Sequence, residues 1–414
     1  MESGIPFWFD GVEAPVYPML DEDLHVDVAI VGAGQVGLHC AYRLQDTGLR
    51  VVLLEALRIG RQATGRSTAK ITTQHGQKYA TLVEKFGRDG ASVYAEANAA
   101  AIAEITRLAA DMEDGGGLEP RDAYIYATDE SQVRQLEKEA ETARSLGLPA
   151  EMVTDAGLPF PTAALLRYTG QYKYHPYRYM CELASRLRIP VYEGSRVTEI
   201  TDGSPITLTA NGRTVMAQHV VVSTQMPVVN EGMFFARAFP FAHPVVAAPL
   251  PEGMQLDGMF ISAGSPSHSL RTADMNGRTY IIAAGPEYKS GQTEEEQGAM
   301  DDLRAFLEEA FGVGAPTHAW TNEDFKPMDG VAFVGPVKSG GNLLIATGFE
   351  AWGITQGVVA ADILADHIMG TTHPAASLFD STRIKPMAGA SEFAKGNIQD
   401  ATHLVGDRLL KRKA

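Results

Sequence analysis

The sequence predicts an α/β chain, α+β overall, in which a parallel-sheet nucleotide-binding domain is interrupted twice by a domain built on antiparallel strands. Two observations predict this fold. A buried strand, a glycine-rich turn and a helix follow one another at 26–46 and again at 343–369. The segments 77–176 and 229–327 instead carry short strands, charged helices and a hairpin signal at Asn276-Gly277.

The first of these units has the physical features of a Rossmann-like dinucleotide site. The apolar run 26–31 is typical of a strand buried in a parallel sheet. Gly32 permits a sharp turn, Gly34 lets the backbone approach a pyrophosphate, and Gly37 lets the following helix, about 35–46, pack closely. The amides and the dipole at the start of that helix favour a phosphate. The alternative is a glycine-rich turn that binds nothing.

The next strand, 49–54, ends in Glu55, at the position where a carboxylate accepts hydrogen bonds from ribose hydroxyls. A carboxylate there also disfavours a 2′-phosphate. The fingerprint from Gly32 to Glu55 therefore predicts a dinucleotide with a free ribose, which NAD and FAD both provide.

Composition excludes several functional classes. The net charge of −16 over 414 residues argues against a nucleic-acid or anionic-membrane partner. We find no basic leader and no apolar run long enough to span a bilayer, so we expect no membrane span and a cytoplasmic protein. Cys40 and Cys181 lie in apolar helices and read as core residues. The histidines do not show metal-ligand spacing, so no metal site is expected.

The order of these patterns divides the chain. Residues 1–24 form an N-terminal extension expected to pack on the surface. The nucleotide-binding domain is predicted to comprise 25–76, 177–228 and 328–372. The substrate domain is predicted to comprise 77–176 and 229–327. Its helical segments are expected at 77–112, with a break at Gly87–Gly90, at 130–146 and at 294–311. Residues 373–414 form a C-terminal extension.

Further motifs extend the resemblance to a known family. The loop Gly60–Lys70, the strand around Val197, and the segments His219–Gln225, Asp329–Pro336 and Ala346–Thr355 resemble the flavin-binding motifs of the FAD-dependent amine and amino-acid oxidoreductases, of the D-amino-acid oxidase and glycine oxidase type. The resemblance spans nearly the whole chain and implies a Rossmann-like FAD-binding domain, an antiparallel-sheet substrate domain and FAD as the cofactor. Cysteine is missing where some relatives attach flavin covalently, so non-covalent FAD is expected.

This resemblance assigns cofactor contacts residue by residue. The residues expected to bind FAD are Gly32, Gly34, Gln35, Val36, Gly37, Glu55, Ala56, Arg61, Thr64, Ser67, Thr68, Ala69, Lys70, Val197, Thr224, Gly348, Trp352, Gly353, Ile354 and Thr355. The helix start at Gly353 to Thr355 can stabilise charge on the reduced flavin ring. Gln225 stands where the family usually has glycine, which weakens that contact.

The chain also resembles the subgroup that carries a C-terminal Rieske iron–sulfur domain. Residues 383–409 resemble the connector before that domain. We expect no Rieske domain here, because the chain lacks the required Cys and His pairs. The electron acceptor beyond flavin is then oxygen, a quinone or a separate protein.

The family's chemistry is oxidation of an amine or amino acid to an imine, followed by hydrolysis. His75 is the candidate for keeping the amine neutral, and Lys70 for stabilising reduced flavin. Trp352 is a candidate wall of the substrate cavity. Arg271 and Lys326 are the candidate anchors of a substrate carboxylate. Each has a structural alternative: a capping histidine, a solvent-facing lysine, or core packing.

Three other functions stay open. A dehydrogenase would pass electrons to a separate iron–sulfur or quinone partner, as the connector-like tail suggests. A flavin-binding protein without turnover is suggested by Gln225. An NAD enzyme would use Glu55 equally well.

Overall fold

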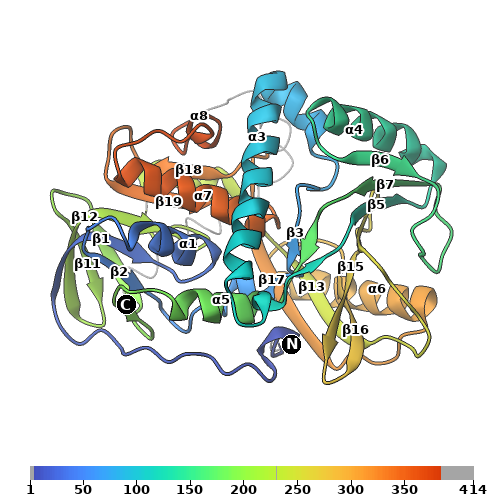
Figure 1. The fold of residues 1–414 in the computed structure, drawn as a ribbon, viewed down its shortest axis with the longest axis horizontal. Helices are drawn as coiled ribbons and strands as arrows, with labels where there is room; N and C mark the ends of the chain where they lie inside the picture. The colour runs from blue at the N-terminus through green and yellow to red at the C-terminus, as the bar shows by residue number, and fades with distance from the viewer. Residues whose placement is uncertain (1–3, 230, 384–414) are drawn as a thin grey trace.

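The computed structural model describes residues 4–229 and 231–383 and shows two lobes, one on each side of the long helix α3 (Tyr79–Ala110) (Figure 1). Gly87, at φ 73°, interrupts the helical backbone near its start, where the sequence predicts a break. Residues 384–409 of the predicted connector lie outside the described part of the chain.

The first lobe is built on a sheet whose central strands are parallel. β1 (Leu24–Val31) lies between β2 (Val51–Leu54) and β12 (Arg213–Val222), and all three run in the same direction. The other strands of this sheet are β9 (Val191–Tyr192), β10 (Val197–Thr201), β11 (Ile206–Ala210), β18 (Phe333–Pro336) and β19 (Leu343–Thr347). Its strands thus come from three separate stretches of sequence.

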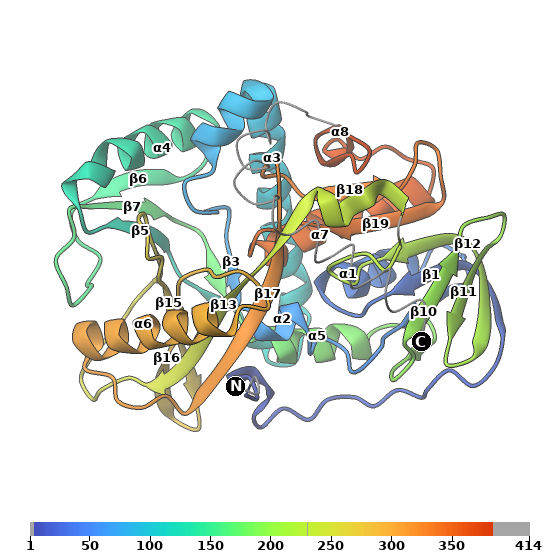
Figure 2. The ribbon, with the colours of Figure 1, turned by 180° about the vertical axis from the view of Figure 1, so that it is seen from behind.

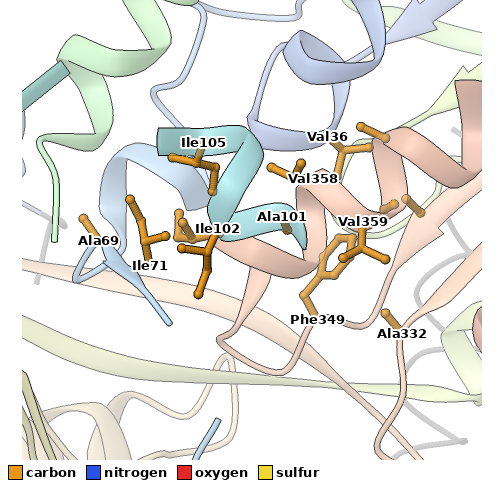
Figure 3. Packing of buried hydrophobic residues seen from close by; sticks show 14 of the residues in the cluster. Val36, Ala69, Ile71, Ala101, Ile102, Ile105, Ala332, Phe349, Val358 and Val359 are labelled. Atoms are coloured by element: carbon orange, nitrogen blue, oxygen red, sulfur yellow. The ribbon is translucent and has the colours of Figure 1, made fainter. Parts of the chain in front are cut away.

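Two helices follow strands of this sheet and pack on each other. α1 (Gln35–Leu44) follows β1, and α7 (Gly353–Ile368) follows β19. A Cβ on Gly357 would lie 2.8 Å from Cγ of Gln35, so a glycine in α7 permits their close approach. Figure 3 shows Val36 of α1 near Val358 of α7, with Ile102 of α3 in the same buried cluster. This packing fixes both helix N-termini relative to the sheet.

The second lobe is an eight-stranded, mainly antiparallel sheet. Its order is β17 (His318–Pro327), β13 (Ala238–Pro249), β16 (Arg278–Ala284), β15 (Ser269–Met275), β14 (Met259–Ser262), β5 (Ala123–Ala127), β7 (Ala164–Tyr168) and β6 (Ala150–Val153). The β15–β16 hairpin turns at Asn276-Gly277, both at positive φ, as the sequence predicts. Helix α6 (Thr293–Phe311) lies along this sheet (Figure 2).

The remaining described elements include a small three-stranded sheet and four further α-helices. β3 (Lys70–Ile71) pairs with β8 (Tyr172–Lys173), which also pairs with β4 (Glu119–Pro120). The other helices are α2 (Ala63–Arg66), α4 (Val133–Ser145), α5 (Pro176–Ser185) and α8 (Ala376–Phe379). No described helix is both long and apolar enough to cross a bilayer.

The N-terminal segment is not a surface layer throughout. Phe7 and Trp8, in a short 3-10 helix (Phe7–Phe9), are buried in the main core. Trp8 Nε1 donates to the Ser67 carbonyl oxygen over 2.9 Å. The expectation of surface packing is therefore wrong for these two residues, because a distant loop supplies the partner for the indole.

Candidate active site

A cavity of about 390 Å³ opens where the first sheet meets the second. Its lining includes the carboxyl ends of β1, β2 and β12, the start of α1, and the turn before α7. Residues of β17 form the opposite wall. In open α/β sheets, ligands bind outside the carboxyl ends of the strands, which is where this cavity lies.

Glycine is required in the first turn by geometry. Gly32 has φ 102°, and a Cβ there would lie 2.7 Å from the Ser223 carbonyl oxygen. A Cβ on Gly37 would lie 1.8 Å from the Gly32 carbonyl oxygen. Both contacts are with backbone, which cannot move aside. Gly37 does not line the cavity, but its missing side chain lets the turn fold tightly enough to present Gly34 to the cavity.

Two helix N-termini meet at this cavity. α1 begins after Gly34 and α7 after Trp352, and neither N-cap residue accepts a hydrogen bond through its side chain. At the start of α1 the first amide is already bonded, because Gln35 N–H donates to Thr64 Oγ1 over 3.1 Å. Gln35 also joins the two helix starts, because its Nε2 donates to the Ile354 carbonyl oxygen over 3.0 Å. The remaining N-terminal amides favour anionic groups. The cavity therefore suits a ligand with negative charge at two points.

Glu55 holds the turn around the cavity. Its Oε2 accepts from the Ala33 amide and its Oε1 from the Leu57 amide, each over 2.8 Å. Burial raises the pKa of Glu55, against the effect of these hydrogen bonds. Val197 lines the same region. Each carboxylate oxygen of Glu55 keeps a lone pair that the amides do not use, and the proposed hydrogen bonds from the ribose hydroxyls would be accepted there.

The loop Gly60–Lys70, which is the second loop at the cavity after the Gly32–Gly37 turn, is held from outside the cavity by buried basic side chains. Arg271 on β15 donates through Nη1 to the carbonyl oxygens of Thr68, Ala69 and Tyr174, at 3.2, 2.6 and 3.0 Å. Lys70 Nζ donates to the Phe260 carbonyl oxygen and to Ser269 Oγ, each over 2.6 Å. Burial lowers the pKa of Lys70 to about 7 and that of Arg271 to about 9. Neither cation lines the cavity, so both appear as supports of the loop.

His75 supports the start of α7. Its Nδ1 lies 2.7 Å from Tyr94 Oη and its Nε2 3.0 Å from Thr355 Oγ1, while the ring stacks on Trp352 at 4.8 Å. Burial lowers the pKa of His75 to about 3, so its imidazole is neutral at pH 7. Neither His75 nor Trp352 lines the cavity.

Lys326, the other candidate carboxylate anchor, lies near the surface. Its Nζ is 2.8 Å from Glu287 Oε2 and sits over the Phe241 ring at 5.1 Å. It does not line the cavity either. The structure thus brings none of the five candidate catalytic side chains into the cavity wall.

Most of the expected cofactor residues do line the cavity. These are Gly32, Gly34, Gln35, Val36, Glu55, Ala56, Arg61, Thr64, Ser67, Val197, Thr224, Gly353 and Ile354. The others lie behind them: Gly37, Thr68, Ala69, Lys70, Gly348, Trp352 and Thr355. The division follows local structure, since glycine turns and helix starts are exposed to the cavity and the residues just beyond them are not.

Sequence reasoning missed the opposite wall. Asn322 and Asp324, two apart on β17, both line the cavity. Only the strand register, which pairs them with His243 and Phe241 of β13, places them there. The sequence itself carried no signal for this, because Trp320 is followed by four polar residues, 321–324, without apolar alternation.

Gln225 takes the conformation of the glycine it replaces. Its φ is 67°, and it lines the cavity. The Gln225 Nε2 donates to the Glu323 carbonyl oxygen, and Thr347 Oγ1 donates to the Gln225 carbonyl oxygen. These hydrogen bonds hold the left-handed backbone without a glycine.

Comparison with known proteins gives the family. The family model described as FAD dependent oxidoreductase matches residues 27–367. The chain belongs to this family. FAD is therefore its cofactor, and the chain is an FAD-dependent oxidoreductase.

Two individual proteins of the comparison are similar to this chain at 29% and 30% sequence identity. A putative Rieske 2Fe-2S iron-sulfur protein of Bacillus subtilis, YhfW, is 29% identical over 99% of this chain and 82% of its own length. Gamma-glutamylputrescine oxidoreductase of Escherichia coli is 30% identical over half of each chain.

Solved structures share the fold. Glycine oxidase from Geobacillus kaustophilus superposes with a TM-score of 0.69 at 19% identity, over 87% of this chain and all of that one. L-amino acid deaminase from Proteus vulgaris has a TM-score of 0.69 at 17% identity, over 91% and 98% of the two chains.

The residues present fit FAD. The cradle at Gly34 leaves backbone exposed where a pyrophosphate needs close approach, and the start of α1 lies beside it. The start of α7 lies in the same cavity, where its amides would favour negative charge on the flavin end of FAD. Cys40 and Cys181 are buried and do not line the cavity, consistent with non-covalent binding.

Proposed function

We propose that this protein oxidises a primary or secondary amine or an amino acid to the imine, which water then hydrolyses. Bound FAD supplies the acceptor, taking a hydride at N5 from the carbon that bears nitrogen. The observation that carries the proposal is the single cavity shared by the glycine cradle, the start of α7 and the polar β17 wall. A substrate between that wall and the flavin would lie within reach of both.

The protein's contribution is mainly orientation and electrostatics. We propose that Arg271 and Lys70 hold the second loop against the cofactor through their carbonyl contacts. His75 would act as a positioning residue, since it fixes Thr355 and Trp352 at the start of α7. Neither task requires a side-chain base.

Anaerobic reduction of the flavin by a panel of amines and amino acids tests this function. At least one amine is expected to bleach the flavin absorbance in the absence of oxygen. A yellow protein that no amine bleaches would instead support a flavin-binding role without turnover.

We propose oxygen as the oxidant of the reduced flavin. A separate iron–sulfur or quinone acceptor is the second candidate, favoured by the likeness to a Rieske-named protein. Stopped-flow mixing of the reduced protein with dissolved oxygen separates the two. Fast reoxidation supports an oxidase, whereas sluggish reoxidation that a quinone accelerates supports a dehydrogenase.

A further inference from the structure

The β17 wall carries two buried polar side chains whose bonding is incomplete. Asn322 is 6% and Asp324 7% exposed, and both line the cavity. The Asn322 amide oxygen is buried without a hydrogen-bond partner. A buried acceptor left without a donor costs about 1–3 kcal/mol, which a bound ligand with N–H groups would recover.

Asp324 lacks a protein counter-charge. Its two oxygens accept the Phe325 and Ala351 amides, at 2.7 and 2.6 Å. Burial raises the pKa of this carboxyl to about 7, and the nearby charges that act on it, Glu350 and Glu287, raise it further. No ion pair within 4–229 and 231–383 involves Asp324. A cation delivered by a ligand would supply the missing partner.

The side chains next to Asn322 and Asp324 do not supply the cation that a ligand would bring. Strand register places His243 opposite Asn322 and Phe241 opposite Asp324. Burial lowers the pKa of His243 to about 4, so that imidazole is neutral at pH 7. Lys326 Nζ forms an ion pair with Glu287 Oε2 at 2.8 Å. The β17 residues that face the cavity, Asn322 and Asp324, are therefore one neutral amide and one carboxyl, and β17 places no cation beside them in the described lining of the cavity.

A second cavity, about 350 Å³, adjoins this wall. It shares Gln62, Ala63, Gln225 and Asn322 with the first. Its lining includes Glu296 and Glu323 but only one cation, Arg66, which donates to the Thr321 carbonyl oxygen. This excess of carboxylates favours the approach of a positively charged molecule to Asn322.

We propose that Asp324 and Asn322 form a subsite for the substrate's ammonium group, and that the substrate is a cationic amine without a required carboxylate. The Asp324 carboxylate and the Asn322 amide oxygen would each accept an N–H of that group, and the carboxylate would take up the ammonium's proton before the hydride leaves, so that the amine is neutral when its carbon is oxidised. The inference rests on the proposed function and names its substrate class. The two buried or paired cations expected to anchor a carboxylate, Arg271 and Lys326, point elsewhere in the structure.

Ligand titration of the FAD-loaded protein tests the subsite without turnover. Straight-chain alkylammonium salts, methyl to hexyl, are expected to perturb the flavin spectrum with saturation, and the matching carboxylates to do so at least tenfold more weakly. Asp324→Asn keeps the side chain's shape and an oxygen for the amides but removes its charge. It is expected to weaken alkylammonium binding by on the order of 30-fold, since hydrogen bonds to charged groups contribute about 1.5–3 kcal/mol.

The matched control is Asp274→Asn on β15, because that carboxylate is exposed and lines neither cavity. It should bind alkylammonium as the wild type does. Asp324→Asn with unchanged affinity and full FAD content would overturn the proposal and limit Asp324 to holding the turn at Ala351. If Asp324→Asn does not retain FAD, the titration of the wild type decides. The proposal would be overturned if the wild type binds the carboxylates as tightly as the alkylammonium ions, or if neither changes the flavin spectrum.

The outcome also separates this subsite from the function on which it rests. Amines that bind through Asp324 but never bleach the flavin would leave the subsite standing and refute the oxidation. Amines that bleach the flavin equally in the wild type and in Asp324→Asn would leave the oxidation standing and refute the subsite.

Discussion

The two walls of the cavity are built in opposite ways. The wall from the first sheet binds through backbone: glycine turns and helix starts at Gly34 and Trp352. The β17 wall presents the side chains Asn322 and Asp324, which the protein leaves short of partners. On the proposed function, local main-chain geometry would hold the cofactor, whereas substrate choice would depend on a few side chains that distant strands bring together.

The largest effect should come from the backbone wall. Gly37→Ala would push a Cβ to 1.8 Å from the Gly32 carbonyl oxygen, so we expect loss of bound FAD and a large loss of folded protein. Gly298→Ala is the matched control, also in a helix but with nothing within 4 Å, and it should be neutral or stabilising by up to about 1 kcal/mol. The flavin-to-protein ratio of each purified variant is the measurement; a Gly37→Ala protein with full FAD would refute the close-packed turn.

The support behind that wall should matter nearly as much. Arg271→Met leaves the carbonyl oxygens of Thr68, Ala69 and Tyr174 without this donor, so the free energy of unfolding should fall by about 3 kcal/mol. Urea denaturation measures the loss, and Arg278→Met on the exposed end of β16 is the control. In the Arg271→Met protein that remains folded and active, kcat/KM should fall by the same factor for n-propylamine and for 2-aminobutyrate. A loss confined to the amino acid would restore Arg271 as a carboxylate anchor.

The backbone wall is predictable from the sequence and the β17 wall is not, for a physical reason. Gly32 to Glu55 form a contiguous βαβ unit, so spacing alone fixes their relation. Lys70 and His75 were expected to act on flavin and amine and Arg271 to anchor a carboxylate, but their polar atoms meet Phe260, Tyr94 and Ala69, which follow from packing. Asn322 reaches the cavity through pairing with β13, about 80 residues earlier, which no short motif encodes.

The charge on the β17 wall should carry a stability cost that depends on pH. The pKa of Asp324 is raised from 3.8 to about 7, so folded protein holds this proton more tightly than unfolded protein does. The wild type therefore loses stability as pH rises from 3.8 to about 7, whereas Asp324→Asn does not. Without amine, the variant's advantage in unfolding free energy should be about 2–3 kcal/mol larger at pH 8 than at pH 5.

Urea denaturation at both pH values checks this, with Asp274→Asn as the control. An advantage that is the same at pH 5 and pH 8 would mean that Asp324 is not a buried, unpaired carboxylate.

The smallest effect is expected at Glu55. Glu55→Gln keeps one oxygen for the amides of Ala33 and Leu57 but weakens a ribose contact, so FAD affinity should fall about tenfold, or 1.4 kcal/mol. Quenching of flavin fluorescence on binding measures the dissociation constant. Unchanged affinity would leave Glu55 with only its role in the turn.

Anaerobic reduction by a matched pair of substrates shows whether the β17 wall selects an amine over an amino acid. n-Propylamine and 2-aminobutyrate differ only by the carboxylate on the carbon that bears nitrogen. We predict that the amine bleaches the flavin of the wild type at least tenfold faster than the amino acid at equal concentration, and that Asp324→Asn abolishes this preference, since a charge-assisted contact contributes about 1.5–3 kcal/mol. Faster bleaching by 2-aminobutyrate, unaffected by Asp324→Asn, would contradict the account.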